Sequence, residues 1–184
     1  MIIITGSEKP ADKYLYKILD AAVNEYVSIL YSDASHLIQP EKDADILFFR
    51  AAQFKEITCP HGAFIVRSSS CLPEKIQCKN YAVIVDSSDT ASVSQIAKRK
   101  LKAITCGLSR TDTITLSSLA VDSAVLSLQR PLTAFDGIIV EPFELPVSFQ
   151  TPVDAFSLMA CFAALCLLGE KTPFIQKNLW NLAF

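Results

Sequence analysis

The first part of the chain places short, continuously apolar runs between helical or polar segments, a pattern typical of buried parallel strands. An apolar residue every three or four positions predicts two helices between these strands, over residues 10–24 and 90–100. Ser7 is the candidate N-cap of the first helix, and Pro10 is tolerated in its first turn. The predicted strands, in chain order, cover residues 2–6, 26–31, 46–49, 63–66, 81–86 and 101–106.

The second part of the chain alternates apolar and polar residues with a period of two. This alternation predicts half-exposed antiparallel strands over residues 113–117, 123–128 and 143–149. A long helix is expected from Thr151 to Leu168, with Thr151 as its cap, Pro152 in the first turn and Gly169 as its stop. It is apolar nearly all round, so it should be deeply buried. A last short helix is expected over residues 173–182, with Trp180 as a packed anchor.

Residues 50–81 are the hardest part to interpret. Residues 63–66 fit a strand, and Ser68, Ser69 and Ser70 resemble a turn. Two interpretations stay open for the segment as a whole: a shortened connection, or a surface loop that carries the function. The serine run lacks the glycine spacing of a nucleophile elbow.

Composition favours one α/β domain over residues 1–184. The chain has 184 residues, 51% of them apolar and 20% charged, which suits a sheet covered on both faces. We expect a three-layer, Rossmann-like sheet of the P-loop type, mostly parallel, with an added antiparallel section towards the C-terminal half. The formal net charge of −2 provides no basic field for nucleic acid or an anionic membrane. The start lacks the features of a signal peptide, and the longest apolar run is shorter than the about 20 residues of a membrane span, so we expect a cytoplasmic protein.

The side chains able to bind metals or act as nucleophiles form no familiar motif. The chain has six cysteines and no CxxC pair, and most of them are expected to be reduced, buried apolar residues. Cys59, His61, Cys71 and Cys78 offer soft ligands for zinc, but their spacing matches no common zinc site, so no metal is expected. His36 and His61 are expected to have surface or structural roles. Cys106 is expected to be an inert buried thiol, and Arg110 is expected to form a surface ion pair with Asp112.

The beginning of the chain has the strand, turn and helix order of a phosphate-binding loop. In such a loop a helix N-terminus and free backbone N–H groups hold the phosphate. A lysine followed by serine or threonine normally completes the site. Here the turn after Gly6 continues through Lys9-Pro10-Ala11, and proline has no N–H to donate.

The opening Ile2-Ile-Ile-Thr-Gly-Ser7 segment resembles the start of the ATP-binding central domain of the Mur ligases and folylpolyglutamate synthetases. The likeness continues in Ala82-Val-Ile-Val-Asp86 and in the segment from Lys102 through Gly107-Leu108-Ser109 to Ser117. It ends in the strand and alanine-rich helix between Phe143 and Gly169. The resemblance implies that fold and an ancestral ATP and Mg²⁺ site. It covers both ends of the chain and is weak over residues 30–80.

Departures from the family pattern bear on activity. The Gly-Lys-Thr of the family falls on Lys9-Pro10-Ala11, and the family's metal-binding Glu and His and its modified Lys cannot be placed. The family's acidic motif after the strand is represented by Asp86 and Asp89, out of register. We expect the domains that flank the central one in these ligases to have no counterpart in this chain. Since phosphoryl transfer depends on positioning and on neutralising phosphate charge, we expect no catalysis and no cofactor.

Three functions stay open. The first is a non-catalytic, Mur-ligase-like domain that acts by binding a protein partner or by assembly. The second is a residual nucleotide site, or a ligase-like enzyme, that binds ATP and Mg²⁺ at the Gly6 turn, with Lys9 or Lys13 supplying positive charge. The third is a structural homodimer. The candidate nucleotide-binding residues are Thr5, Gly6, Ser7, Lys9, Asp86 and Asp89; no residue is assigned to catalysis or to a metal.

Overall fold

A computed structural model describes the molecule over residues 2–6, 13–23, 26–33, 35–38, 40, 43–51, 55–67, 72–169 and 180–182. The described helices and strands, in chain order, are β1 Ile2–Gly6, α1 Lys13–Val23, β2 Ile29–Ser32, β3 Leu37–Ile38, β4 Ile46–Arg50, β5 Glu56–Val66, β6 Lys75–Asp86, α2 Thr90–Lys98, β7 Ala103–Gly107, β8 Ile114–Leu119, β9 Ser123–Leu128, β10 Leu132–Thr133, β11 Ile139–Val140, β12 Phe143–Phe149, α3 Ala155–Leu168 and β13 Trp180–Leu182.

Eleven of the described strands form one sheet in the order β13-β12-β9-β8-β7-β6-β5-β1-β4-β2-β3. The strands from β2 to β8 in this order are parallel to their neighbours. β9 and β12 extend the sheet with antiparallel pairing. A separate hairpin joins β10 and β11. The predicted fold class, a mostly parallel α/β sheet with an antiparallel section in the second half, is confirmed.

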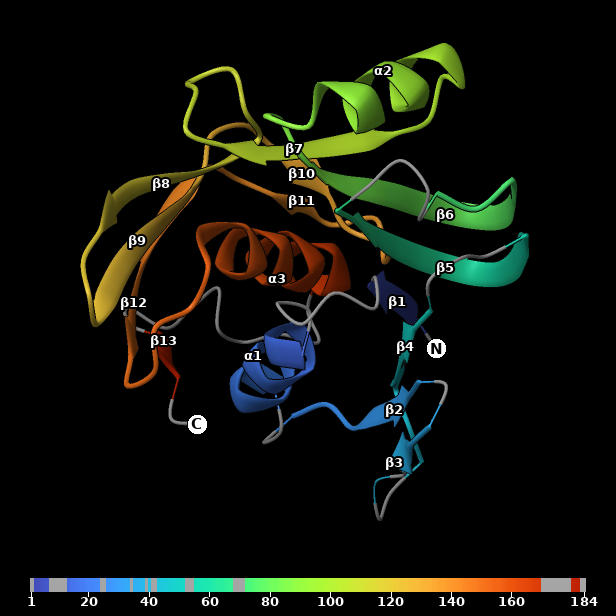
Figure 1. Cartoon of the computed structure of the whole chain (residues 1–184), viewed down its shortest axis with the longest axis horizontal. Coiled ribbons are helices and arrows are strands. Elements are labelled where there is room, and N and C mark those ends of the chain that lie inside the picture. The colour runs from blue at the N-terminus through green and yellow to red at the C-terminus, as the bar shows by residue number, and fades with distance from the viewer. Residues whose placement is uncertain are drawn as a thin grey trace.

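Helices cover both faces of the sheet (Figure 1). α1 and α3 lie on one face and α2 lies on the other. The larger apolar core lies between the sheet and the α1–α3 layer, and the smaller one lies under α2. Every residue of α3 from Phe156 to Leu168 is buried, which confirms the expectation of a helix that is apolar all round. Of the described helices, none has the length and apolar content needed to cross a membrane.

The strands of the middle segment are longer than predicted. β5 and β6 have 11 and 12 residues and pair in parallel from Glu56↔Lys75 to Val66↔Val85. Both open interpretations of residues 50–81 are therefore wrong for the described part, because most of it is sheet. The polar residues of Glu56–Pro60 and Lys75–Asn80 conceal the strands from a search for apolar runs, and Pro60 argues against a strand in sequence.

Two predictions at the C-terminal end are corrected. The N-cap of α3 is Asp154, whose side chain accepts from Ser157 N, and Pro152 precedes the helix. The predicted helix over residues 173–182 is wrong at its end, since Trp180–Leu182 is strand β13 parallel to β12; its earlier residues lie outside the described part. The stop at Gly169 and the burial of Trp180 are confirmed.

Candidate functional site

The carboxyl ends of β2, β4, β1, β5, β6 and β7 form one edge of the sheet, because these strands are parallel neighbours. Open α/β sheets bind their ligands at this edge. Thr5 and Gly6 are the last residues of β1, and Asp86 is the last residue of β6. The predicted site residues Ser7 and Lys9 lie outside the described residues, as do Pro10 and Ala11. The sheet order thus places three of the six predicted residues at the ends of two strands, with β5 between them.

Two arginines that the sequence analysis missed flank the end of β1. Arg50 ends β4 and is the register partner of Gly6, and Arg67 directly follows β5 on the other side of β1. Both side chains are largely buried, with 9% and 14% of their surface exposed. The sequence did contain a signal for both arginines, because each follows an apolar strand segment. A charged residue in that position lies at the edge of the sheet where ligands bind.

Arg67 is bound to the beginning of α3. Its Nη2 lies 3.0 and 3.1 Å from the two carboxylate oxygens of Asp154 and also donates to Ser157 Oγ. Its guanidinium carbon lies 4.8 Å from the ring centre of Phe156. Asp154 at the same time caps α3 by accepting from Ser157 N at 3.0 Å. The charge of Arg67 is therefore compensated by the helix that packs over the sheet.

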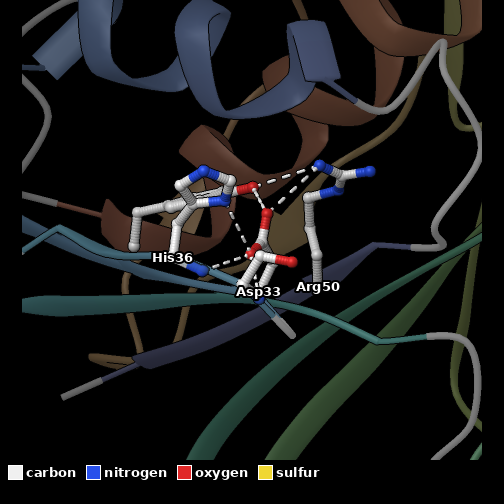
Figure 2. Close-up of polar contacts among 5 residues, drawn as sticks. Asp33, His36 and Arg50 are labelled. Carbon is white, nitrogen blue, oxygen red and sulfur yellow. Dashed lines mark hydrogen bonds and ion pairs between the residues drawn. The ribbon is translucent and has the colours of Figure 1, made fainter.

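Arg50 is bound to a second acidic group, at the end of β2. Arg50 Nη1 donates to the Tyr31 hydroxyl at 3.1 Å and lies 3.8 Å from Asp33 Oδ2. The Tyr31 hydroxyl in turn donates to Asp33 Oδ2 at 2.7 Å. The other oxygen of Asp33 accepts from the backbone N–H groups of Ser35 and His36 and lies 3.1 Å from His36 Nδ1, and Figure 2 shows Asp33 between His36 and Arg50.

These hydrogen bonds hold Asp33 in its ionised form. They lower the pKa of its carboxyl well below the ordinary value, with the bond from Tyr31 as the largest cause. The pKa of Tyr31 is raised, mainly by burial and then by its bond to Asp33. His36 is exposed and serves this cluster, which agrees with the surface role expected for it. The cluster is an internally neutralised ion pair at the same edge as Arg67 and Asp154.

The predicted acids of the β6–α2 connection have partners within the chain. Asp86 accepts from Ser88 N at 2.8 Å and from Ser88 Oγ at 2.6 Å. Asp89 is the N-cap of α2 and accepts from Ser92 N at 3.1 Å. These bonds give both side chains local roles in ending a strand and starting a helix.

Asp112 corrects a prediction. It is 3% exposed, so the expected surface ion pair with Arg110 is wrong. Its Oδ2 accepts from Ser87 Oγ at 3.1 Å and from Ser109 N at 3.0 Å. The turn after β7 therefore closes around a buried carboxylate, which fixes the connections after β6 and β7 against each other.

Gly107 leaves the space that this carboxylate occupies. A Cβ at position 107 would lie 2.2 Å from Ser87 Oγ and 2.4 Å from Asp112 Oδ2. Gly107→Ala is expected to lower the free energy of unfolding by about 1–2 kcal/mol, because both side chains must move. Chemical denaturation measures this loss. A Gly107→Ala/Ser87→Ala double variant should recover part of it, and a neutral Gly107→Ala would contradict the described packing.

The thiols behave mostly as expected. Cys106 is fully buried, and burial, followed by the nearby Asp112 and Asp86 carboxylates, raises its pKa well above the ordinary value, so it is not activated as a nucleophile. Cys59 and Cys78 are register partners with their sulfurs 3.1 Å apart. Burial and the bond to Cys78 raise the pKa of Cys59 to about 12. No group of three potential metal ligands occurs among the described residues, which do not include Cys71.

A cavity of about 580 Å³ opens at the carboxyl ends of β6 and β7. Its apolar wall includes Phe156 and Met159 of α3, and Asp86 and Ser88 lie at its border. Leu108 and Leu119 also line it and are 80% and 55% exposed. The volume of the cavity is within the range of small-molecule sites, about 300–1,000 Å³.

The sheet order, the covering helices and the crevice at the strand ends define an open, Rossmann-like α/β domain. Solved structures with the same fold are Mur ligases. UDP-N-acetylmuramoylalanyl-D-glutamyl-2,6-diaminopimelate–D-alanyl-D-alanyl ligase from Acinetobacter baumannii superposes with a TM-score of 0.57 at 12% identity, over 96% of this chain and 45% of that chain. A crystal structure of MurF from Acinetobacter baumannii gives 0.57 at 12% identity, over 96% and 44%.

A third neighbour is the UDP-N-acetylmuramate:L-alanyl-gamma-D-glutamyl-meso-diaminopimelate ligase of Neisseria meningitides, with a TM-score of 0.54 at 7% identity, over 93% of this chain and 62% of that chain. The chain thus spans less than half the length of the two Acinetobacter structures. No protein-family model and no curated protein sequence matches it. Identities of 7–12% show a shared fold, and at that level the resemblance read from the sequence is confirmed.

Proposed function

We propose that this chain is a Mur-ligase-like domain that performs no phosphoryl transfer and acts by binding or assembly. The observation that carries the proposal is the internal pairing of charge at the carboxyl edge. Arg67 is bound to Asp154, and Arg50 is bound to Tyr31 and lies beside Asp33. A ligand phosphate would have to compete with these carboxylates for both guanidinium groups.

Phosphoryl transfer needs cations directed at the phosphates and acidic or hydroxyl ligands for Mg²⁺. In this chain the sequence at the loop is Lys9-Pro10-Ala11, where a phosphate-binding loop has a lysine followed by a hydroxyl residue. The two predicted acidic residues, Asp86 and Asp89, accept hydrogen bonds from Ser88 and Ser92. Both observations support a domain in which the polar groups at the carboxyl edge bind one another and are not directed at a ligand.

Titration with Mg·ATP tests the proposal. We expect no release of ADP and no change in melting temperature beyond that produced by Mg²⁺ alone, because a ligand stabilises only in proportion to its binding. The control is the same titration with Mg²⁺ and with ATP separately, which removes effects of ionic strength. A rise of several degrees that requires Mg²⁺ and ATP together would overturn the proposal.

A residual nucleotide site is the second candidate, because Arg50 and Arg67 flank the carboxyl end of β1. If the triphosphate displaces Asp33 and Asp154 from them, the amide signal of Gly6 should shift on addition of ATP, with or without Mg²⁺. Arg67→Gln should weaken that response, whereas Arg130→Gln, on an arginine that donates to the Thr111 carbonyl in an exposed turn, should not.

Exposed apolar side chains favour one form of the leading proposal, in which the domain acts by assembly through an apolar surface. Leu108, Leu119 and Val121 are 80%, 55% and 83% exposed and belong to β8 or the turns that border it. Leu108 and Leu119 line the same cavity, and adjacent exposed apolar side chains commonly mark interaction surfaces. Sedimentation at micromolar concentration distinguishes a homodimer from a monomer that would bind a different protein.

A further inference from the structure

A second cavity lies at the opposite end of the sheet from the carboxyl edge. Its volume is about 590 Å³, and its walls include His61 of β5, Lys79 of β6 and Lys102, which directly precedes β7. His61 is paired with Ile2, the first described residue of β1, and β7 pairs with β6 only from Val83 onward. The cavity therefore opens beside the amino-terminal parts of these strands, remote in the topology from Gly6, Arg67 and Asp86.

Two lysines and one acid line this cavity, so the described lining has an excess of one positive charge. Lys79 and Lys102 both line it, and neither forms an ion pair with a described residue. The acid on the wall, Asp136, is engaged by its own turn: its Oδ1 accepts from Ile138 N at 3.0 Å, and its carboxylate packs against Gly169. The net positive charge of the lining attracts an anion.

His61 adds an unsatisfied hydrogen-bonding atom. Its Nδ1 is buried and has no hydrogen-bond partner within the described structure, while its ring lies 5.5 Å from the ring of Phe135. Buried polar atoms without a partner are rare in folded proteins, so each one calls for an explanation. A ligand oxygen can accept from this nitrogen when it carries the proton and the ring turns the buried atom towards the cavity.

Apolar side chains form much of the remaining wall and come mainly from the β10–β11 region and the end of α3. Leu132, Phe135 and Leu167 line the cavity together with Ile104 of β7. Small-molecule sites combine such apolar walls with a few convergent polar groups, and their usual volume is about 300–1,000 Å³. The cavity has both features, so its ligand should have an apolar body and a charged end.

We propose that this cavity binds a small organic anion, whose phosphate or carboxylate lies between Lys79 and Lys102 and whose apolar part rests on Phe135 and Leu132. The site is separate from the carboxyl edge and does not depend on whether that edge binds a nucleotide. The domain would therefore bind this anion even if no nucleotide binds at the carboxyl edge.

The experiment is an amide chemical-shift titration of the full chain, with inorganic phosphate in one arm and butyrate in the other. Wild-type protein should show saturable shifts at Asn80, Tyr81 and Ala103 in at least one arm. Phosphate alone identifies a phosphorylated ligand, and butyrate alone identifies a carboxylate with an apolar tail. Lys79→Gln/Lys102→Gln should weaken binding by about tenfold, the loss expected from two exposed charge pairs.

The matched control is Lys98→Gln/Lys100→Gln. It removes the same charge from neighbouring exposed lysines that do not line the cavity, and it should leave the dissociation constant unchanged. If the control weakened binding equally, the effect would come from general surface charge, and the proposal would be overturned. Absence of saturable shifts in both arms at concentrations on the order of 10 mM, where even weak specific sites fill, would also overturn it. His61→Phe, which keeps the ring and removes the nitrogen, should weaken binding without unfolding the protein.

Discussion

Replacing Asp154 by alanine is expected to lower the free energy of unfolding by about 3 kcal/mol, the sum of a lost helix cap and lost charge-assisted hydrogen bonds. The cap contributes about 1 kcal/mol of this. The rest comes from Arg67, whose side chain is 14% exposed and would keep its charge without the carboxylate that now lies 3.0 Å away. Asp154 itself is 37% exposed, so solvent screening keeps the loss below that of a fully buried pair.

Two variants make this measurement specific. Asp154→Asn keeps a good capping side chain but removes the charge, so its cost in urea denaturation isolates the contribution of Arg67. Asp122→Ala removes an exposed carboxylate that accepts a hydrogen bond from the neighbouring Ser123 hydroxyl, and it should cost less than about 0.5 kcal/mol. If Asp154→Ala lowered the free energy of unfolding no more than Asp122→Ala does, the ion pair between Arg67 and Asp154 would not contribute to stability.

Gly169→Ala is expected to have a similarly large effect, about 3 kcal/mol, because it combines backbone strain with a steric clash. Gly169 ends α3 with φ 66° and ψ −132°, a conformation that residues with a Cβ avoid. A Cβ there would lie 2.0 Å from Asp136 Oδ2, so the Asp136 carboxylate would have to leave its position.

Gly137 provides the matched control for this prediction. Its φ is 92°, and a Cβ would meet no atom within 4 Å, so Gly137→Ala reports the backbone term alone, about 1–2 kcal/mol. Comparing Gly169→Ala in the native and Asp136→Ala backgrounds separates the clash from the strain. A cost for Gly169→Ala no greater than that for Gly137→Ala would show that the carboxylate does not occupy the described position.

Regular patterns made most of the fold readable from the sequence. Strict alternation located β9 and β12 at the bounds the structure gives them, and the apolar runs located β4 and β7 within one or two residues. The long β5 and β6 were missed in part because exposed polar residues such as Glu56 and Lys75 alternate there with Ile57 and Ile76, so no continuous apolar run marks these ends. β13 was mistaken for helix because its three residues carry too little periodicity to outweigh a helical window.

The candidate site was less accessible to the same reasoning. Gly6 and Asp86 could be assigned to the ligand-binding edge because each follows an apolar strand. The partners of Arg67 could not, since Asp154 and Ser157 are 87 and 90 positions away in sequence and meet it only through the packing of α3. The burial of Asp112 could not be predicted either. The local sequence of a short turn does not show whether its carboxylate points to solvent or accepts hydrogen bonds inside the turn.

The position of α3 has a consequence for the order in which the molecule can form. This helix contacts α1 and strands from β5 to β10, yet it is encoded after all of them. Until it has been synthesised, the core that includes Ala63 and Ile104 lacks one of its two covering helices. Formation of this core therefore depends on contacts between segments that are distant in sequence, which form slowly.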